Sequence, residues 1–331
     1  MEYNQGQRVN DWLIPALKIV LGGTCLLLVL SFVASYIITG YHTYSTDYLK
    51  ADELGLDARK FTLTGAQDTP LHGLFVPGDP RMPVLIASHG IADCKEGILP
   101  FMLPFARSGY GIVAYDLRHH NESGGRHCTL GYWEHDDLCA LSAYVQTQLA
   151  PGRPIAYWGF SLGATVSLLA TAQSNNVFAV IAHCPFASMR AVVSHYMRAF
   201  YHVPAWPIVP LTLKFFEWRT GARVAAVDVC AAAPRLRDVP VLVFGSDEDP
   251  QVPVVWLEQI VDAIGPTAEL VVGPYGHMDG MIAEDEGLYD QRDIAMTLEF
   301  LERHRPRDVP GEPADARTDQ AHAGAAPESS G

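Results

Sequence analysis

The sequence has few positive charges for its length and lacks the short motifs that bind nucleotides. Lys and Arg number 23 against 37 Asp and Glu in 331 residues, so the net charge is −14 and no basic stripe is present. Nucleic acid is recognised by basic patches, so we expect no nucleic-acid partner. Neither Gly-x-x-x-x-Gly-Lys-Ser/Thr nor Gly-x-Gly-x-x-Gly occurs. We therefore expect no nucleotide cofactor.

The six cysteines also lack a pattern. They contain no Cys-x-x-Cys pair, which argues against a zinc or thioredoxin-like site. We interpret most of them as small buried side chains. If the domain is exported, a disulfide between Cys128 and Cys139 is an alternative.

A long uncharged apolar run is present near the N-terminus, at residues 19–38. Roughly 20 apolar residues match a bilayer core of about 30 Å. A cleaved signal peptide has a shorter core, and a buried helix is usually shorter and more polar, so we interpret the run as an uncleaved single-pass anchor. Cys25 lies mid-run, which argues against a lipoprotein. Arg8 and Lys18 precede the run, whereas Lys50 is the nearby cation that follows it. By the positive-inside rule, this distribution favours an extracytoplasmic position for the rest of the chain.

The remaining chain divides by composition. We expect an N-terminal segment at 1–40, a polar linker at 41–57, one large domain at 58–303 and a disordered tail at 304–331. With 49% hydrophobic and 18% charged residues, the chain can bury the core of such a domain. The tail has almost no large apolar residues, so it cannot offset the entropy of ordering.

Apolar runs bounded by Gly and Pro alternate with helical stretches through the large domain. Two strands at 60–64 and 71–76 are predicted to form a hairpin. Further strands are predicted at 84–88, 111–115, 155–158, 177–182, 241–245 and 269–272. Helices are predicted at 101–107, 133–149, 162–172, 253–264 and 290–303. Fully apolar strands alternating with helices predict an α/β fold, a mostly parallel sheet with helices on both faces.

An aromatic-rich insertion at about 186–234 interrupts this alternation. Pro204, Pro207 and Pro210 prevent one long helix. We interpret the insertion as a small helical cap whose aromatics line an apolar substrate pocket. It could instead be a packed side of the main core, or a surface that rests on the membrane.

The stretch Gly159-Phe160-Ser161-Leu162-Gly163 lies between a predicted strand and a predicted helix. A strand that runs into a helix through Gly-x-Ser-x-Gly is a nucleophile elbow, in which a strained turn exposes the serine hydroxyl. Side chains at 159 and 163 would collide with the neighbouring strand and helix. We therefore expect Ser161 to be a nucleophile.

A serine hydroxyl needs a base to take its proton, and a carboxylate to orient that base. Two later loops supply both, because an acidic stretch follows the strand at 241–245 and His277 follows the last strand. The carboxyl ends of parallel strands share one edge, so these loops should meet Ser161. We assign His277 as the base and Asp249 as the acid, with Asp247 and Glu248 as open alternatives.

The negative oxygen of an acyl-transfer intermediate needs backbone donors. The N–H of Leu162 directly follows the nucleophile. The loop after the strand at 84–88 carries Gly90, which permits a tight backbone. We expect the second donor to be the N–H of Ile91.

These motifs together resemble the α/β-hydrolase superfamily. The resemblance covers about 61–303 and is closest to bacterial serine hydrolases of esterase or serine-aminopeptidase-like type. It rests on His89-Gly90, on 159–163, on Asp249-Pro250-Gln251-Val252-Pro253, on Gly276-His277 and on the segment 115–125. In the family that segment has glycines where this chain has His119 and Asn121, which suggests a modified loop beside the pocket. The family's usual spacing from Gly245 to the acid would select Glu248, so the acid stays open.

The same segment holds residues that could bind a metal. Because it matches a structural loop of the family and the catalytic trio needs no metal, we expect none. The residues are His119, His120, His127, His135, Asp136 and Asp137.

The sequence thus predicts a membrane-anchored serine hydrolase without cofactors, acting through an acyl-enzyme on small-molecule carboxylic esters with an apolar acyl group. A peptidase or amidase, or an acyltransferase, would use the same trio. A catalytically silent hydrolase fold that serves as a membrane-tethered binding module is the remaining alternative.

Overall fold

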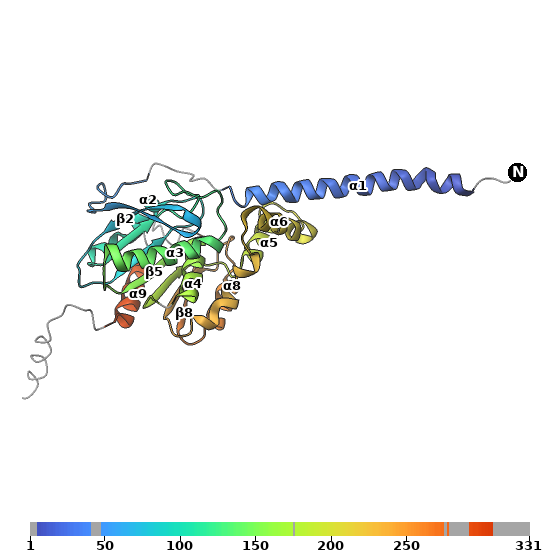
Figure 1. The fold of residues 1–331 in the computed structure, drawn as a ribbon. Helices are drawn as coiled ribbons and strands as arrows, with labels where there is room; N and C mark the ends of the chain where they lie inside the picture. The colour runs from blue at the N-terminus through green and yellow to red at the C-terminus, as the bar shows by residue number, and fades with distance from the viewer. Residues whose placement is uncertain (1–4, 41–47, 175, 275–276, 278–290, 307–331) are drawn as a thin grey trace, which may run out of the picture.

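The computed structural model describes residues 5–40, 48–174, 176–274, 277 and 291–306. Most of the expected linker, at 41–47, and most of the expected tail, at 307–331, lie outside these residues. The described chain forms one sheet flanked by helices, with one long helix that projects from it (Figure 1). The strands are β1 (Arg59–Thr64), β2 (Pro70–Val76), β3 (Val84–Ser88), β4 (Gly111–Tyr115), β5 (Ile155–Phe160), β6 (Ala179–His183), β7 (Val241–Ser246) and β8 (Ala268–Gly273).

Nine α-helices are found in the described residues. They are α1 (Gln5–Ile37), α2 (Lys95–Arg107), α3 (Tyr132–Tyr144), α4 (Leu162–Gln173), α5 (Met189–Ala199), α6 (Ala205–Thr220), α7 (Val229–Ala232), α8 (Val254–Ile264) and α9 (Gln291–His304). A π-helical turn, Val145–Leu149, extends α3 and completes the predicted helix at 133–149.

The eight strands form one sheet in the order β1-β2-β4-β3-β5-β6-β7-β8. β2 pairs antiparallel with β1 and β4, whereas every pair from β4 to β8 is parallel. The sequence-based fold class is therefore confirmed. Because β3, β5, β7 and β8 run in one direction, the loops after them emerge at the same edge of the sheet.

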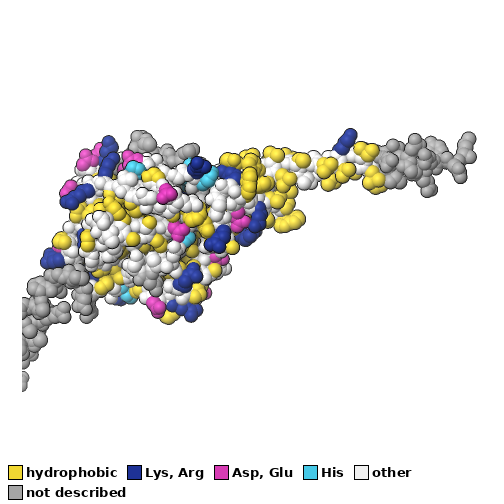
Figure 2. Space-filling model, in the orientation of Figure 1, with side chains coloured by type: hydrophobic (Ala, Val, Ile, Leu, Met, Phe, Trp, Pro, Cys, Tyr) yellow, Lys and Arg dark blue, Asp and Glu magenta, His cyan; other side chains and the backbone are white. Residues whose placement is uncertain are grey.

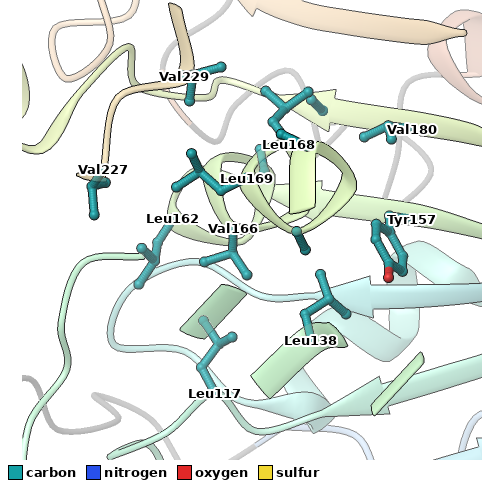
Figure 3. Packing of buried hydrophobic residues seen from close by; sticks show 14 of the residues in the cluster. Leu117, Leu138, Tyr157, Leu162, Val166, Leu168, Leu169, Val180, Val227 and Val229 are labelled. Carbon is teal, nitrogen blue, oxygen red and sulfur yellow. The ribbon is translucent and has the colours of Figure 1, made fainter. Parts of the chain in front are cut away.

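Alternate side chains of each strand enter two separate cores, as the period of a strand requires. One core lies under α3, α4 and α8, and the other under α2 and α9. α4 lies at the centre of the first core, where its side chains pack against neighbouring loops and helices (Figure 3). The residues shown there include Leu117, Leu138, Tyr157, Leu162, Val166, Leu168, Leu169, Val180, Val227 and Val229. This packing fixes the first turn of α4, which follows Ser161.

The insertion after β6 forms α5 and α6, which lie beside the end of α1 where it meets the domain (Figure 1). We call α5 and α6 the cap. The rings of Phe32 and Phe215 meet edge to face with centroids 5.4 Å apart. The guanidinium of Arg219 lies 3.3 Å from the centre of the Tyr36 ring and donates to the Ser35 carbonyl at 2.7 Å. The C-terminal end of α1 is therefore packed onto the domain.

All six cysteines are free, and Cys128 and Cys139 form no disulfide. Cys94, Cys128 and Cys184 are buried, in keeping with their interpretation as small core side chains.

Candidate active site

Ser161 occupies the turn between β5 and α4 in a strained conformation, with φ 50° and ψ −112°. Its N–H donates to the His183 carbonyl at 2.7 Å, which holds the turn against β6. A Cβ on Gly159 would lie 2.4 Å from the Gly163 carbonyl oxygen, and one on Gly163 would lie 2.0 Å from that of Ser88. The steric reason given for both glycines is confirmed, and the tight turn lifts Ser161 to the edge of the sheet.

Two other loops at this edge bring His277 and Asp249 to the serine. His277 Nε2 lies 3.2 Å from Ser161 Oγ, and His277 Nδ1 lies 2.5 Å from Asp249 Oδ2. Asp249 is buried, whereas Asp247 and Glu248, its two neighbours in the loop after β7, are exposed. Of the three acids that the sequence left open, Asp249 is the one that contacts the imidazole.

The environment of Asp249 keeps its carboxylate ionised. Oδ1 accepts hydrogen bonds from the backbone N–H groups of Gln251 at 2.7 Å and Val252 at 3.0 Å. Burial raises the pKa of Asp249, but the hydrogen bond and charge of His277 together with these amides lower it further, so the net pKa is below its ordinary value. A carboxylate can only accept, so Nδ1 of His277 carries the proton and Nε2 is free to accept one from Ser161.

Backbone amides of two elements lie near Ser161. Ile91 and Leu162 line the same cavity as Ser161, and a Cβ on Gly90 would lie 3.7 Å from Ser161 Cβ. Leu162 begins α4, and the first N–H groups of a helix have no partner within it. Both expected oxyanion donors therefore belong to segments that meet at the serine.

His89 supports the loop that carries Ile91. Burial lowers the pKa of His89 to about 4, so the ring is neutral near pH 7. Its Nε2 accepts from the Leu117 N–H at 3.0 Å, and its Nδ1 therefore carries the proton that it donates to the Gly90 carbonyl at 2.6 Å. Since that carbonyl belongs to the peptide unit whose other end is the Ile91 N–H, the ring fixes the direction of the amide.

Lys95 ties the same loop to the loop after β4. Its side chain is 1% exposed, and its ammonium donates to Asp116 and Glu122, each at 2.7 Å. Burial opposes the charged form, but these carboxylates outweigh it and raise the pKa of Lys95. The sequence did not reveal this buried lysine, because a single Lys before a helix resembles any exposed charge.

Two residues of the loop after β4 adopt a backbone conformation that favours glycine. His119 and Asn121 have φ values of 62° and 41°, the left-handed region that favours glycine. Asn121 donates to Asp116 at 3.2 Å. Leu130, farther along this loop, lines the cavity at Ser161, whereas His119 and Asn121 are not among the described residues that line it. Asn121 lies beside the Lys95 cluster, where its amide also approaches Glu96 at 3.3 Å, whereas the His119 ring lies near the Gly125 carbonyl and the His127 ring.

The groups that could geometrically hold a metal already have other partners. Cys184, Asp249 and His277 approach within 4.8 Å of one another, but His277 is shared between Asp249 and Ser161. In a second group, of Cys94, Glu96 and Asp116, both carboxylates already pair with the Lys95 ammonium. In the histidine-rich segment, Asp137 accepts two hydrogen bonds from Arg118, at 2.6 and 2.7 Å.

An apolar cavity of about 190 Å³ lies beside Ser161. It is formed by the cap, by loops of the main domain and by the C-terminal end of α1. None of the described residues that line it is charged. They are Ala34, Ile37, Ile38, Ile91, Leu130, Ser161, Leu162, Phe186, Val192, Val193, Tyr196, Met197, Tyr201 and Val203.

The contribution of α1 to this wall was not predicted from the sequence. A signal was present, since Ser31, Ser35 and Thr39 recur every four residues and so share one face of the helix. All three are buried. Small residues at such spacing allow close helix packing.

Comparisons with known proteins agree with this architecture. The family model described as "Serine aminopeptidase, S33" matches residues 79–220. The uncharacterized protein YqkD of Bacillus subtilis is 28% identical over 209 residues, which span 62% of this chain and 68% of that protein. The structure of the Pyrococcus furiosus esterase Pf2001 is similar, with a TM-score of 0.66 at 20% identity, covering 81% of this chain and 99% of that one. The α/β hydrolase GrgF from Penicillium sp. gives a TM-score of 0.59 at 20% identity over 75% and 99%.

Proposed function

Because this chain is a serine hydrolase of the α/β-hydrolase superfamily, we propose that it cleaves carboxylic esters through an acyl-enzyme formed on Ser161. The hydrogen-bonded chain from Ser161 through His277 to Asp249, beside an apolar cavity, is the observation that carries the proposal. An ester with an apolar acyl group fits a cavity whose described lining has no charge.

In the proposed mechanism, His277 Nε2 takes the hydroxyl proton as Ser161 Oγ attacks the ester carbonyl carbon. The carbonyl oxygen becomes an oxyanion and accepts hydrogen bonds from the N–H groups of Leu162 and Ile91. Asp249 stabilises the imidazolium that forms. As the intermediate collapses, the C–O bond to the alcohol breaks and the leaving oxygen takes the proton from His277.

The second half of the cycle repeats these roles with water. His277 accepts a proton from a water molecule, whose oxygen attacks the acyl carbon. The acid is released, and the proton returns to Ser161 Oγ. Attack by another alcohol in place of water would transfer the acyl group, so excess acceptor in the assay distinguishes hydrolysis from transfer.

We infer that α1 is a retained membrane anchor. Its segment Trp12–Ile37 is long and apolar enough to cross a bilayer, which a signal sequence could equally satisfy. The packing of Phe32, Ser35 and Tyr36 on the cap supports retention. Loss of this helix would uncover the face of α6 that meets it.

A fluorophosphonate probe tests the nucleophile, since it labels only an activated serine. We expect the wild type to be labelled and to hydrolyse p-nitrophenyl butyrate, and Ser161→Ala to lose both. Ser174→Ala, a change just after the C-terminal end of the same helix and away from the turn, is the matched control and should retain both. Retained labelling in Ser161→Ala would overturn the assignment. Parallel assays on aminoacyl p-nitroanilides test the rival peptidase activity, and a preference for them would reject ester specificity.

A further inference from the structure

The mouth of the cavity lies between the end of α1 and the segment that joins α5 to α6. Ile37 and Tyr201 both line the cavity, and they are 55% and 58% exposed. A residue that lines a cavity and is also more than half exposed marks its opening. Ala34 and Ile38, on the same side of α1, continue the wall inward from this point.

Outside the face that meets the cap, α1 exposes apolar side chains between Trp12 and Ile37 (Figure 2). Val29 and Val33 are 56% and 48% exposed, whereas Ser31 and Ser35 are fully buried. The helix therefore presents one face to the cap and the other to its surroundings. The cavity opens where these two faces meet, beside the exposed apolar side chains of α1.

The length of the apolar run sets the level of this opening in a bilayer. Residues 19–38 span roughly 30 Å at 1.5 Å per residue, the thickness of the hydrocarbon core. The wall residues Ala34 to Ile38 lie in about the last 6 Å of that length. Trp206 and Trp218 of α6 are 79% and 76% exposed, and tryptophan favours the boundary between hydrocarbon and headgroups. The mouth therefore faces that boundary.

We propose that the substrate is a long-chain ester that resides in the membrane, and that its acyl chain enters the cavity directly from the bilayer along α1. Ala34, Ile37 and Ile38 then determine which chain lengths are accepted. The inference rests on the proposed ester hydrolysis at Ser161. Direct entry keeps the acyl chain out of water. Each methylene that had to pass into water would lower the equilibrium constant for leaving the bilayer by about fourfold.

The first test compares two substitutions on adjacent residues of α1 in full-length protein reconstituted in phosphatidylcholine vesicles. Ala34→Trp places a ring in the cavity wall, whereas Val33→Trp places the same ring on the exposed side. We measure kcat/KM for p-nitrophenyl palmitate and p-nitrophenyl butyrate. In Ala34→Trp, the ring should exclude about two methylenes of the acyl chain from contact with the cavity wall. The ratio of kcat/KM for palmitate to that for butyrate should therefore fall about tenfold. Val33→Trp should keep the wild-type ratio, and an equal ratio in all three proteins would overturn the proposal.

The second test uses the wild type and so does not depend on the folding of a variant. A fluorophosphonate with a twelve-carbon chain that ends in a photoreactive diazirine is allowed to react with Ser161 in the same vesicles. After illumination, mass spectrometry should find crosslinks to residues 34–38. Crosslinks confined to α5 would overturn the proposal while leaving the esterase assignment intact. Failure of the probe to attach to Ser161 would instead reject the proposed function.

Discussion

The two carboxylate oxygens of Asp249 contact different groups, so the substitution Asp249→Asn tests what each contact contributes. Oδ1 accepts from the N–H groups of Gln251 and Val252, and Oδ2 faces His277 Nδ1. In asparagine only one of the two positions can accept a hydrogen bond. The two backbone donors hold the amide oxygen, so the NH₂ group must face the imidazole.

A donor opposite His277 Nδ1 requires that nitrogen to accept, which moves the imidazole proton to Nε2. Nε2 would then donate to Ser161 in place of accepting from it, and the general base is lost. The backbone contacts of the loop are kept, so the protein should fold. Loss of the correct tautomer in a serine triad costs roughly 10⁴ in kcat, or about 5.5 kcal/mol of transition-state stabilisation. We expect that fall in kcat with little change in KM.

Steady-state hydrolysis of p-nitrophenyl butyrate measures the loss, and the rate of fluorophosphonate labelling measures it independently. The isosteric changes Asp247→Asn and Glu248→Gln serve as matched controls, because both side chains are exposed. They should remain within about twofold of the wild type, as surface changes usually do. Activity of Asp249→Asn within tenfold of the wild type, or an equal loss in either control, would show that Asp249 does not set the tautomer of His277.

Three further predictions concern the supports of the site. His89→Ala should lower kcat about tenfold to a hundredfold in steady-state kinetics, because the amide that it orients is an expected oxyanion donor; reduced thermal stability with unchanged kcat would contradict this. Lys95→Met should destabilise the fold by about 3–5 kcal/mol in urea unfolding, since it leaves Asp116 buried without its cation; a loss below 1 kcal/mol would contradict it. The lowered pKa of Asp249 means that its stabilising contribution is present above about pH 4 and is lost as the pH falls through its folded value. The difference in Tm between wild type and Asp249→Asn should therefore shrink below pH 4, and a constant difference would argue against it.

The buried strands were predictable because both of their faces are apolar and glycine or proline bounds them. β3 and β4 begin and end at the predicted residues, and β7 differs only by the addition of Ser246. A strand buried on both sides leaves a continuous hydrophobic run, which few other elements produce at that length.

Helix α2 was less predictable. The predicted helix began at 101, whereas α2 begins at Lys95 and contains Pro100 and Pro104. Proline inside a helix is disfavoured, so the pattern indicated a later start. The buried ion pairs of Lys95 fix the first turn, and such tertiary contacts leave no local signature.

The candidate site was predictable to the level of its loops and no further. Ser161 and His277 each follow a predicted parallel strand, and the carboxyl ends of parallel strands lie at one edge of the sheet. Their placement at the same edge could therefore be predicted. The choice among three neighbouring acids depends on the path of a loop, which no periodic pattern records. The cavity wall at Ala34 depends on how an apolar helix docks, and hydropathy alone does not distinguish its faces.

The docking of α1 on α6 has a practical consequence for how this protein should be prepared. Expression of the chain from residue 48 onward would yield a more soluble product, but it would remove Ala34, Ile37 and Ile38 from the pocket and take away the Phe32 ring that packs on Phe215 and Trp218. Substrate screens on such a fragment would report on a pocket that lacks one wall and is more open to water than the pocket of the full chain. Kinetic constants should therefore be measured on the intact polypeptide, in lipid if α1 is the membrane anchor that we propose.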